Sequence, residues 1–312
     1  MNNYSEFVKT FSSPNTAKVI NSLSDIGNYE YSDCTAEEIE QVILNLKPNS
    51  PKAIRTICYV MSLYGKYLNN VNLIRQVRDL NQIEIWEKAK PLAKSKFLSH
   101  MEFEAAYHEI GMYEGCNALY YQTIFWCIYE GIFNNDMSVL KNLKASDISG
   151  NTIILREDNG HSYEFVAHEK LIQDLKELAT IDIGERKNRY GIFQINVQGV
   201  SPDCCFKIEN RGADNDSQYA YRYSYYRQLR KITNEYLGRS IVPTQIFVSG
   251  IMYRIRMMLQ HEGITLEEAF ALDNRDKMVK KIVVDELARC NYDILYSNFK
   301  EIVKGHLDIF SV

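Results

Sequence analysis

One segment of the sequence combines arginine, lysine and tyrosine at helical spacing. It covers residues 219–231 and reads YAYRYSYYRQLRK. At about 3.6 residues per helical turn, Tyr223, Arg227 and Arg230 lie near one face, with Lys231 beside them. Arginine and lysine neutralise phosphates, arginine also bonds to guanine edges, and tyrosine hydroxyls can bond to phosphate. The segment alone fits a nucleic-acid contact as well as it fits a solvated basic face with tyrosines half-buried beneath it.

A second group of basic residues lies closer to the N-terminus. Lys52 and Arg55 fall in the first turn of a helix that we expect to begin near Ser50. The helix dipole is positive at that end, so cations are mildly unfavourable there unless an anion binds. Ordinary surface charge is the alternative, although two basic groups on either side of a linker suit a clamp around a duplex.

Charge is distributed unevenly along the chain. The 312 residues carry 36 basic and 40 acidic side chains, and this net charge of −4 by itself argues against nucleic-acid binding. Residues 41–96, however, carry 10 basic and 3 acidic side chains, residues 219–256 carry 7 and 1, and residues 97–140 carry 0 and 6. Two basic islands within an acidic chain indicate a polyanionic partner.

The usual signatures of enzymes are missing from the sequence. It contains no phosphate-binding loop, dinucleotide fingerprint or serine-hydrolase elbow, and its carboxylates are not clustered as an acid–base pair would be. The seven cysteines are irregularly spaced without a C-x-x-C pair, so we expect reduced, buried thiols, no metal site and no cofactor. The N-terminus has no signal-peptide pattern, and the longest apolar run, 119–133, is shorter than the ~20 residues that span a bilayer. We therefore expect a cytoplasmic protein without membrane contact.

Helix signals divide the chain into two parts. Thr35 with Glu38 and Ser99 with Glu102 form capping boxes, and the run 119–133 is typical of a core helix. The basic, proline-containing residues 91–98 are the predicted linker. They separate a helical N-terminal domain, 1–90, from a larger domain, 99–312.

The larger domain contains one strand-rich stretch. Residues 151–156 and 162–166 flank the turn signal Asp158-Asn159-Gly160, which predicts a β-hairpin, and 190–195 can add a third strand. The remaining periodic segments predict helices at 169–178, 218–237, 245–261, 265–272, 275–289 and 292–304. The expected fold class is mainly α with a small β-sheet.

From about residue 97, the order of these elements resembles the catalytic domain of the tyrosine recombinases, or phage integrases. Two characteristic segments of that family flank its β-hairpin and helix, and residues 130–148 and 249–263 match them in order and spacing. Residues 50–68 resemble the family's core-binding domain, whose helix carries basic residues that face DNA. The resemblance implies a core-binding-like helical domain followed by a recombinase-like catalytic domain.

The catalytic residues of that family are not carried over. Its active site uses two arginines, a lysine and histidine-type groups around the phosphate, with a tyrosine as nucleophile. Asn135 or Asp136 stands at the first arginine position, and the hairpin turn 157–161 has no lysine. Ser249 and Met252 replace the histidine and arginine of the second segment. We therefore expect the scaffold to lack recombinase activity and the protein not to be an enzyme.

An integrase-like scaffold that keeps its basic islands also resembles a more specific group. The stretch 119–148 is most similar to the lytic-cycle repressors of SPbeta-type prophages, the MrpR/YopR family. This resemblance implies a sequence-specific DNA-binding transcriptional repressor that maintains prophage lysogeny. Its expected partners are double-stranded DNA at operator sites and, as a further candidate, a phage regulatory protein.

This interpretation assigns the DNA contacts to both domains. The helix at 222–231 is expected to lie in the major groove, with supporting contacts from elsewhere in the chain. Arg254 and Arg256 are two residues apart on one helix and cannot both face one groove, so one of them should be structural. The expected DNA-binding residues are Lys52, Arg55, Lys141, Lys144, Arg222, Tyr223, Arg227, Arg230, Lys231, Arg254 and Arg256.

Two other functions remain open at this point. The first is a divergent but active tyrosine recombinase with Tyr292 or Tyr296 as its nucleophile, although we expect both to be packing residues. The second is a protein-interaction module that does not bind DNA and docks through the acidic stretch 97–140. A covalent adduct with a suicide DNA substrate would identify the first, and absence of any DNA binding would favour the second.

Overall fold

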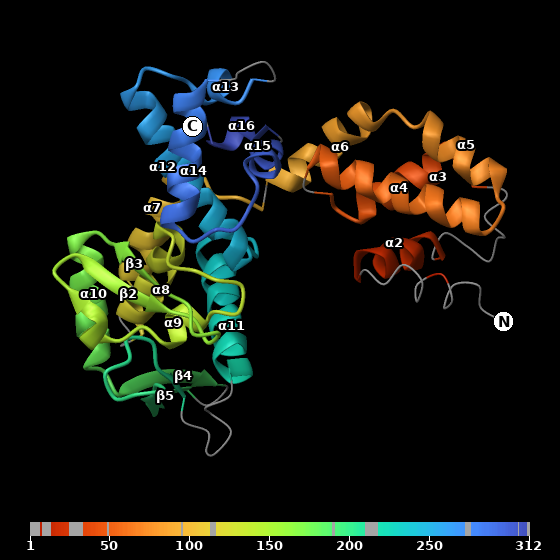
Figure 1. Ribbon diagram of the computed structural model, residues 1–312. Helices are drawn as coiled ribbons and strands as arrows, with labels where there is room; N and C mark the ends of the chain where they lie inside the picture. Colours follow the sequence, from red (N-terminus) through yellow and green to blue (C-terminus); the bar gives the residue numbers. More distant parts are fainter. Residues whose placement is uncertain are drawn as a thin grey trace. The chain divides into compact units, whose positions relative to one another are not determined.

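The computed structural model describes residues 7, 14–24, 34–48, 50–94, 96–112, 117–188, 191–209, 218–271, 276–304 and 306–310. These residues are mainly α-helical, with two small antiparallel sheets (Figure 1). The expected class, mainly α with a small β component, is therefore confirmed. The six described cysteines are all buried and free, as expected from their spacing.

The chain divides into two compact units. Unit 1 comprises Met1–Ser95 and Ser297–His306, and unit 2 comprises Lys96–Tyr296 and Leu307–Val312. The first boundary falls within the predicted linker, 91–98, although helix α6 continues as far as Lys94. The larger predicted domain, 99–312, differs from the structure, because residues 297–306 pack with unit 1. The chain thus passes between the units three times.

Unit 1 is entirely helical in its described part. Its elements are α2 (Pro14–Ser24), α3 (Ala36–Asn45), α4 (Pro51–Tyr67), α5 (Val71–Asp79), α6 (Gln82–Lys94) and α15 (Tyr296–Lys304). Thr35 and Glu38 form the predicted capping box of α3, and the Ser50 side chain caps α4 by accepting from the amide of Ala53. These helices enclose an apolar core that includes Ile20, Ile39, Ile43, Ile54, Met61 and Leu73.

Unit 2 is built around helix α8. Its helices are α7 (His100–Gly111), α8 (Ala118–Glu130), α9 (Ser138–Lys141), α10 (Glu169–Ala179), α11 (Gln218–Leu237), α12 (Pro243–His261), α13 (Leu266–Ala269), α14 (Lys277–Arg289) and α16 (Leu307–Phe310), with a 3-10 turn at Ala145–Asp147. Ile124, Phe125 and Ile128 of α8 are fully buried, which confirms the prediction that the apolar run 119–133 contains a core helix. None of the described helices has the length and apolarity that a bilayer span requires.

A glycine allows α12 to cross α8 closely. A Cβ atom on Gly250 would lie 1.7 Å from the carbonyl oxygen of Tyr129, so no other residue fits without moving the helices apart. This approach places Glu130, at the end of α8, near Arg254, one turn beyond Gly250 on α12. The close crossing therefore positions a network of charged side chains that is described below.

The predicted β-hairpin is present in unit 2. Strands β1 (Ile148–Ser149), β2 (Thr152–Arg156) and β3 (Ser162–Val166) form an antiparallel sheet in that order. The turn between β2 and β3 contains Gly160 at φ +88°, a left-handed conformation that suits glycine. Alternate residues Ile153, Leu155 and Phe165 face the core.

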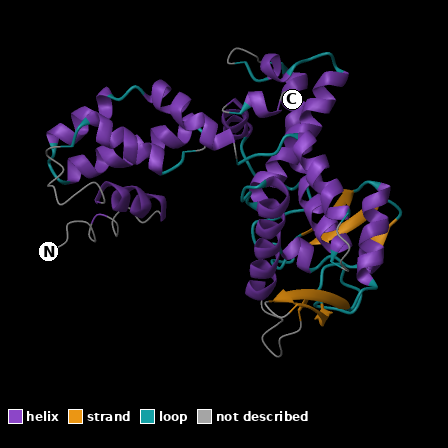
Figure 2. Cartoon of the chain, turned by 180° about the vertical axis from the view of Figure 1, so that it is seen from behind, coloured by secondary structure: helices purple, strands orange, loops and turns teal. Residues whose placement is uncertain are grey.

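The third predicted strand belongs to a different sheet. Residues 191–198 form β5 (Gly191–Gln198), which pairs with β4 (Ile183–Asn188) and β6 (Ile208–Glu209) and not with the hairpin. Tyr190, where that strand was expected to begin, lies outside the described residues. The charged sequence of β4, IGERKN, gives no alternation of apolar and polar residues, so local pattern could not identify the partner strand. The second sheet lies at the N-terminal end of α11 (Figure 2).

Candidate nucleic-acid interface

Helix α11 presents two chemically different sides. Tyr221, Tyr225, Leu229 and Ile232 recur on the buried side, each no more than 1% exposed. The Tyr225 hydroxyl donates to the carbonyl oxygen of Phe206 at 3.1 Å, which fixes the helix to the segment before β6. Two of the five tyrosines in the segment that suggested a nucleic-acid contact thus hold α11 in place instead.

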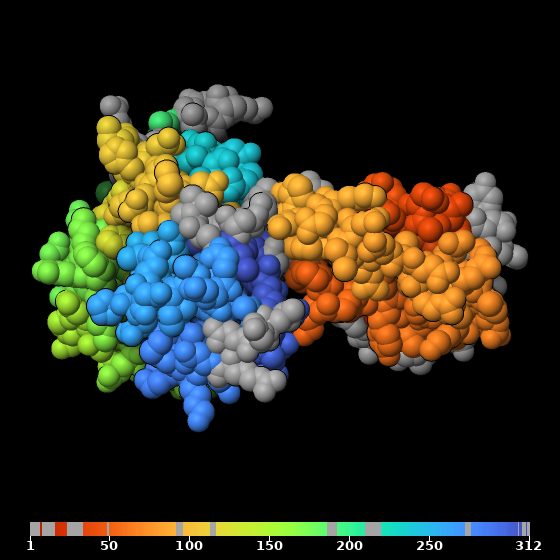
Figure 3. Space-filling view, turned by 90° about the horizontal axis from the view of Figure 1, so that it is seen from above, coloured from red at the N-terminus to blue at the C-terminus, as the bar shows by residue number. Residues whose placement is uncertain are grey.

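The opposite side of α11 carries the predicted cations. Tyr223 is 58% exposed, and Arg227 and Arg230 are exposed as well. With about 100° of rotation per residue, these three side chains fall within ~60° of one another around the helix axis. Neither the Arg227 nor the Arg230 side chain makes an ion pair or hydrogen bond with any part of the chain that the structure describes. Figure 3 shows α11, in cyan, reaching the surface beside α7, in yellow.

The remaining two cations of α11 lie at the margins of that side. Arg222 is about 140° from Arg227 around the axis, and its guanidinium lies over the Tyr226 ring at 5.6 Å. The Lys231 ammonium lies over the ring of Tyr121 on α8, at 5.5 Å. Both residues are exposed, and Arg222 lies about 80° from Arg230 around the axis, so its contact with DNA stays a prediction.

The short helix α9 does not supply an accessible lysine. Lys141 is 8% exposed, and its ammonium forms an ion pair with Asp158 in the hairpin turn. Burial raises the pKa of Asp158, but hydrogen bonds from Lys141 and Asn142 outweigh it, so this pKa lies below its ordinary value. The predicted backbone contact by Lys141 is therefore corrected: this lysine fastens the hairpin to α9. Lys144 is half-buried and bridges Cys204 through its backbone.

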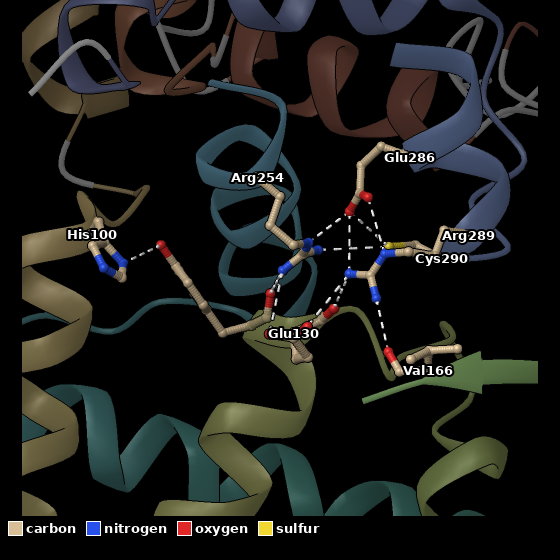
Figure 4. A network of polar contacts seen from close by, with 8 residues as sticks. His100, Glu130, Val166, Arg254, Glu286, Arg289 and Cys290 are labelled. Atoms are coloured by element: carbon tan, nitrogen blue, oxygen red, sulfur yellow. Dashed lines mark hydrogen bonds and ion pairs between the residues drawn. The ribbon is translucent and has the colours of Figure 1, made fainter. Parts of the chain in front are cut away.

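Arg254 lies in a closed network of charges between α8, α12 and α14 (Figure 4). Its Nε donates to Glu286 Oε1 at 2.6 Å, and its Nη1 donates to the carbonyl oxygen of Tyr129 at 2.7 Å. Arg289 donates through Nε to the second Glu286 oxygen at 3.0 Å, and through Nη2 to the carbonyl oxygen of Glu130 at 2.8 Å. We call Glu130, Arg254, Glu286 and Arg289 the arginine–glutamate network.

The network is electrically balanced and largely shielded from solvent. Its two arginines face two glutamates, and the side chains of Arg254 and Glu286 are 16% and 4% exposed. Burial alone would raise the pKa of Glu286, but Arg254 and Arg289 outweigh burial and hold that pKa below its ordinary value. A phosphate could reach Arg254 only by displacing these carboxylates, so the prediction that Arg254 contacts DNA is wrong.

The Arg256 side chain also makes a hydrogen bond within the protein. Its Nη1 donates to the carbonyl oxygen of Phe310 at 3.3 Å, which links α12 to α16, and its side chain is half-buried. Sequence reasoning expected one of Arg254 and Arg256 to be structural and did not identify which. It missed Glu130 and Glu286, because they lie 124 and 32 residues from Arg254 and only the packing of α8 and α14 on α12 brings them to it.

Lys52 and Arg55, the two residues of unit 1 that were predicted to contact DNA, lie on the first turn of α4, next to α15. Lys52 Nζ donates to Asn298 Oδ1 at 2.6 Å, and Arg55 Nη2 forms an ion pair with Glu301 Oε2 at 3.2 Å. Both cations are exposed. Arg55, one of the cations that sequence analysis expected to need an anion, is thus paired with a carboxylate of the same chain.

The positions that the family resemblance relates to catalytic groups are occupied by structural interactions. The Asp136 carboxylate accepts from the amide of Ser138 at 2.9 Å. Ser249 is 1% exposed and accepts from the amide of Leu98 at 2.9 Å, and Met252 is fully buried. The Tyr292 ring packs edge-on against Phe247 at 5.1 Å, and burial raises its pKa.

Tyr296 stands at the start of α15, and burial raises its pKa too. Among the described residues, no group of three or more histidine, cysteine or acidic side chains is arranged to hold a metal ion.

Comparison with known proteins shows distant structural similarity without sequence similarity. No protein-family model matches the sequence, and no curated protein matches it. The chain is similar to the crystal structure of XerA recombinase, with 14% sequence identity and a TM-score of 0.38, over 97% of this chain and 96% of that one.

Proposed function

We propose that this protein is a sequence-specific DNA-binding repressor that uses α11 to read the major groove and does not cleave DNA. The observation that carries the proposal is the exposed side of α11, where Arg227 and Arg230 are without an anionic partner among the described residues. By contrast, Lys141, Arg254 and Arg289 are each paired with carboxylates. Exposed cations that the protein leaves uncompensated are the ones available to phosphate.

The dimensions of α11 are compatible with this role. Tyr223 and Arg230 are seven residues apart, which is about 10 Å along a helix, and the major groove is ~12 Å wide and admits one. Arginine can contact phosphate or bond to guanine through two hydrogen bonds, and an exposed tyrosine can bond to phosphate. The same side chains can therefore supply both affinity and sequence preference.

The repressor role rests on the resemblance of residues 119–148 to the MrpR/YopR repressors of SPbeta-type prophages. That resemblance implies binding to operator DNA and maintenance of lysogeny, with a phage regulatory protein as a candidate second partner. Within the acidic stretch 97–140, the exposed Glu104 and Glu109 of α7 are the candidate surface for that partner, because the stretch bears acidic residues without basic ones. Acidic surroundings also weaken indiscriminate phosphate binding and leave base contacts a larger share of the affinity.

The absence of cleavage is proposed from the residues at the positions related to the catalytic groups. Cleavage needs donors aimed at a developing charge on phosphate, and losing one such donor costs roughly 3 kcal/mol. Asp136, Ser249 and Met252 offer no cation, and the nearby Arg254 is saturated by Glu286. Tyr292 packs against Phe247 and has a raised pKa, which disfavours its action as a nucleophile.

Footprinting of the purified protein across phage DNA tests the proposal directly. We expect discrete protected sites near promoters, with affinity that falls as salt concentration rises. A nicked suicide duplex that contains a protected site tests the absence of cleavage. A covalent protein–DNA adduct would establish the active recombinase instead, and an absence of binding at low salt would favour the protein-interaction module.

A further inference from the structure

Helix α15 is the only described C-terminal element that belongs to unit 1, and it contacts the predicted DNA-binding residues there. Phe299 and Val303 are fully buried on one side of this helix. His306 follows it, also fully buried, with its ring edge-on to Trp86 of α6 at 5.8 Å. The helix is therefore docked by apolar burial, independently of its polar contacts.

The polar side of α15 faces the first turn of α4. Asn298 and Glu301 lie three residues apart, and so do Lys52 and Arg55, so the two pairs meet in register. Asn298 accepts from Lys52 at 2.6 Å, and Glu301 pairs with Arg55 at 3.2 Å. Glu301 thus presents to the Arg55 guanidinium a carboxylate oxygen, the same kind of charged acceptor as a phosphate oxygen.

We infer that α15 is a built-in competitor of DNA, in which Glu301 and Asn298 mask Arg55 and Lys52 until phosphate displaces them. The inference rests on the proposed function. The exchange does not require the helix to undock, because the Arg55 side chain is 57% exposed and the Glu301 side chain 36% exposed while they are paired. Each phosphate contact that Lys52 or Arg55 makes must first break a contact with α15, which lowers the affinity for DNA of any sequence.

Substitution of Glu301 and Arg55, singly and together, tests the competition. The readout is affinity for a mixed-sequence DNA duplex, measured by fluorescence anisotropy over a range of salt concentrations. Glu301→Gln keeps the side-chain shape, removes the masking charge and should raise affinity by about fivefold, the upper range for an exposed ion pair. It should also steepen the salt dependence by about one counterion, because Arg55 gains a phosphate contact.

The double variant distinguishes masking from a general change of charge. Arg55→Gln should have little effect in the natural chain, where Arg55 is masked, and should abolish the gain in the Glu301→Gln background. Glu87→Gln is the matched control, because Glu87 is an exposed carboxylate of α6 in the same unit whose removal changes the net charge equally. Glu87→Gln should change the affinity for the duplex by less than about twofold, because an exposed charge away from the α4 cations contributes little.

Two different results would overturn the inference, and they have different meanings. In the first, the protein binds the duplex, but Glu301→Gln changes the affinity no more than Glu87→Gln does, or Arg55→Gln lowers the affinity equally in both backgrounds. Then α15 does not compete with DNA, and the proposed function stands. In the second, neither the natural protein nor any variant binds the duplex at low salt, although all of them unfold cooperatively. Then the proposed function is wrong, and so is the inference that depends on it.

Discussion

Two pairs of arginines in unit 2 have opposite surroundings. Arg227 and Arg230 lie on the exposed side of α11 without a carboxylate partner in the described chain, whereas Arg254 and Arg289 share the buried Glu286. Arg227, Arg230 and Arg254 belong to the same basic island of the sequence. The comparison shows that net charge over a segment does not identify a binding surface, because a neighbouring element can neutralise a cation completely.

The contrast predicts a separation of effects. Changes in the arginine–glutamate network should alter stability and leave the DNA affinity of the folded protein alone. Changes on the exposed side of α11 should alter DNA affinity and leave stability alone. A variant that altered both strongly would break the comparison.

Glu286→Gln is expected to have the largest effect. It leaves Arg254 and Arg289 short of one buried negative charge, and removal of one partner from a buried pair costs about 3 kcal/mol of unfolding free energy or more. Chemical denaturation measures the loss. Asp285→Asn on the same helix is the control, because the ion pair of Asp285 with Lys281 is exposed and its removal should change stability little. Equal losses of unfolding free energy in the two variants would show that the burial of Glu286 does not set the size of the effect.

The same variant should also change the pH dependence of stability. The pKa of Glu286 is lowered in the folded protein, so its stabilising contribution is complete above the ordinary glutamate value of about 4.3. That contribution is lost as pH falls through the lowered pKa. Glu286→Gln should therefore flatten the acid side of the stability profile, and an unchanged profile would contradict the direction of this shift.

Charge reversal of Arg227 and Arg230 together should have the next largest effect. Two phosphate contacts are lost and two repulsive charges appear, so affinity for a protected site should fall by about 100-fold at moderate salt. Lys277→Glu with Lys280→Glu on α14 is the matched control, since both lysines are exposed and the net charge changes equally. Binding that survives the α11 reversal would mean that another surface reads the DNA.

The smallest expected effect concerns His100 on α7, which packs beside the arginine–glutamate network. Its ring stacks on Tyr253 of α12 with centroids 3.6 Å apart, and its Nδ1 lies 3.2 Å from the Tyr129 hydroxyl. Burial lowers the pKa of His100, Glu104 opposes this shift, and Arg256 adds to it.

The sign of the pH effect follows from that lowered pKa. The unfolded chain binds a proton at about pH 6.5 that the folded protein accepts only at lower pH, so stability should decline as pH falls below that value. Thermal unfolding of His100→Gln and the natural protein at several pH values checks this. A natural protein that becomes more stable on acidification through this range would contradict the lowered pKa.

Much of the fold could be predicted from local sequence. The capping boxes at Thr35 and Ser99, the core helix α8 and the hairpin around Gly160 depend on residues within a few positions of one another. The exposed side of α11 was predictable for the same reason, since helical periodicity sorts Tyr223, Arg227 and Arg230 from the buried tyrosines. In each case the deciding interactions lie within one or two turns of the chain.

The sequence by itself determined which helices form and which cations α11 displays. Only the tertiary structure decided that Lys141 pairs with Asp158, that β5 pairs with β4, and that α15 docks on unit 1, 246 residues from its partner Arg55. Arg254 shows the physical reason most clearly. Its exposure and its charge balance depend on carboxylates that α8 and α14 bring to it, and such partners follow from which helices pack together, not from spacing along the chain.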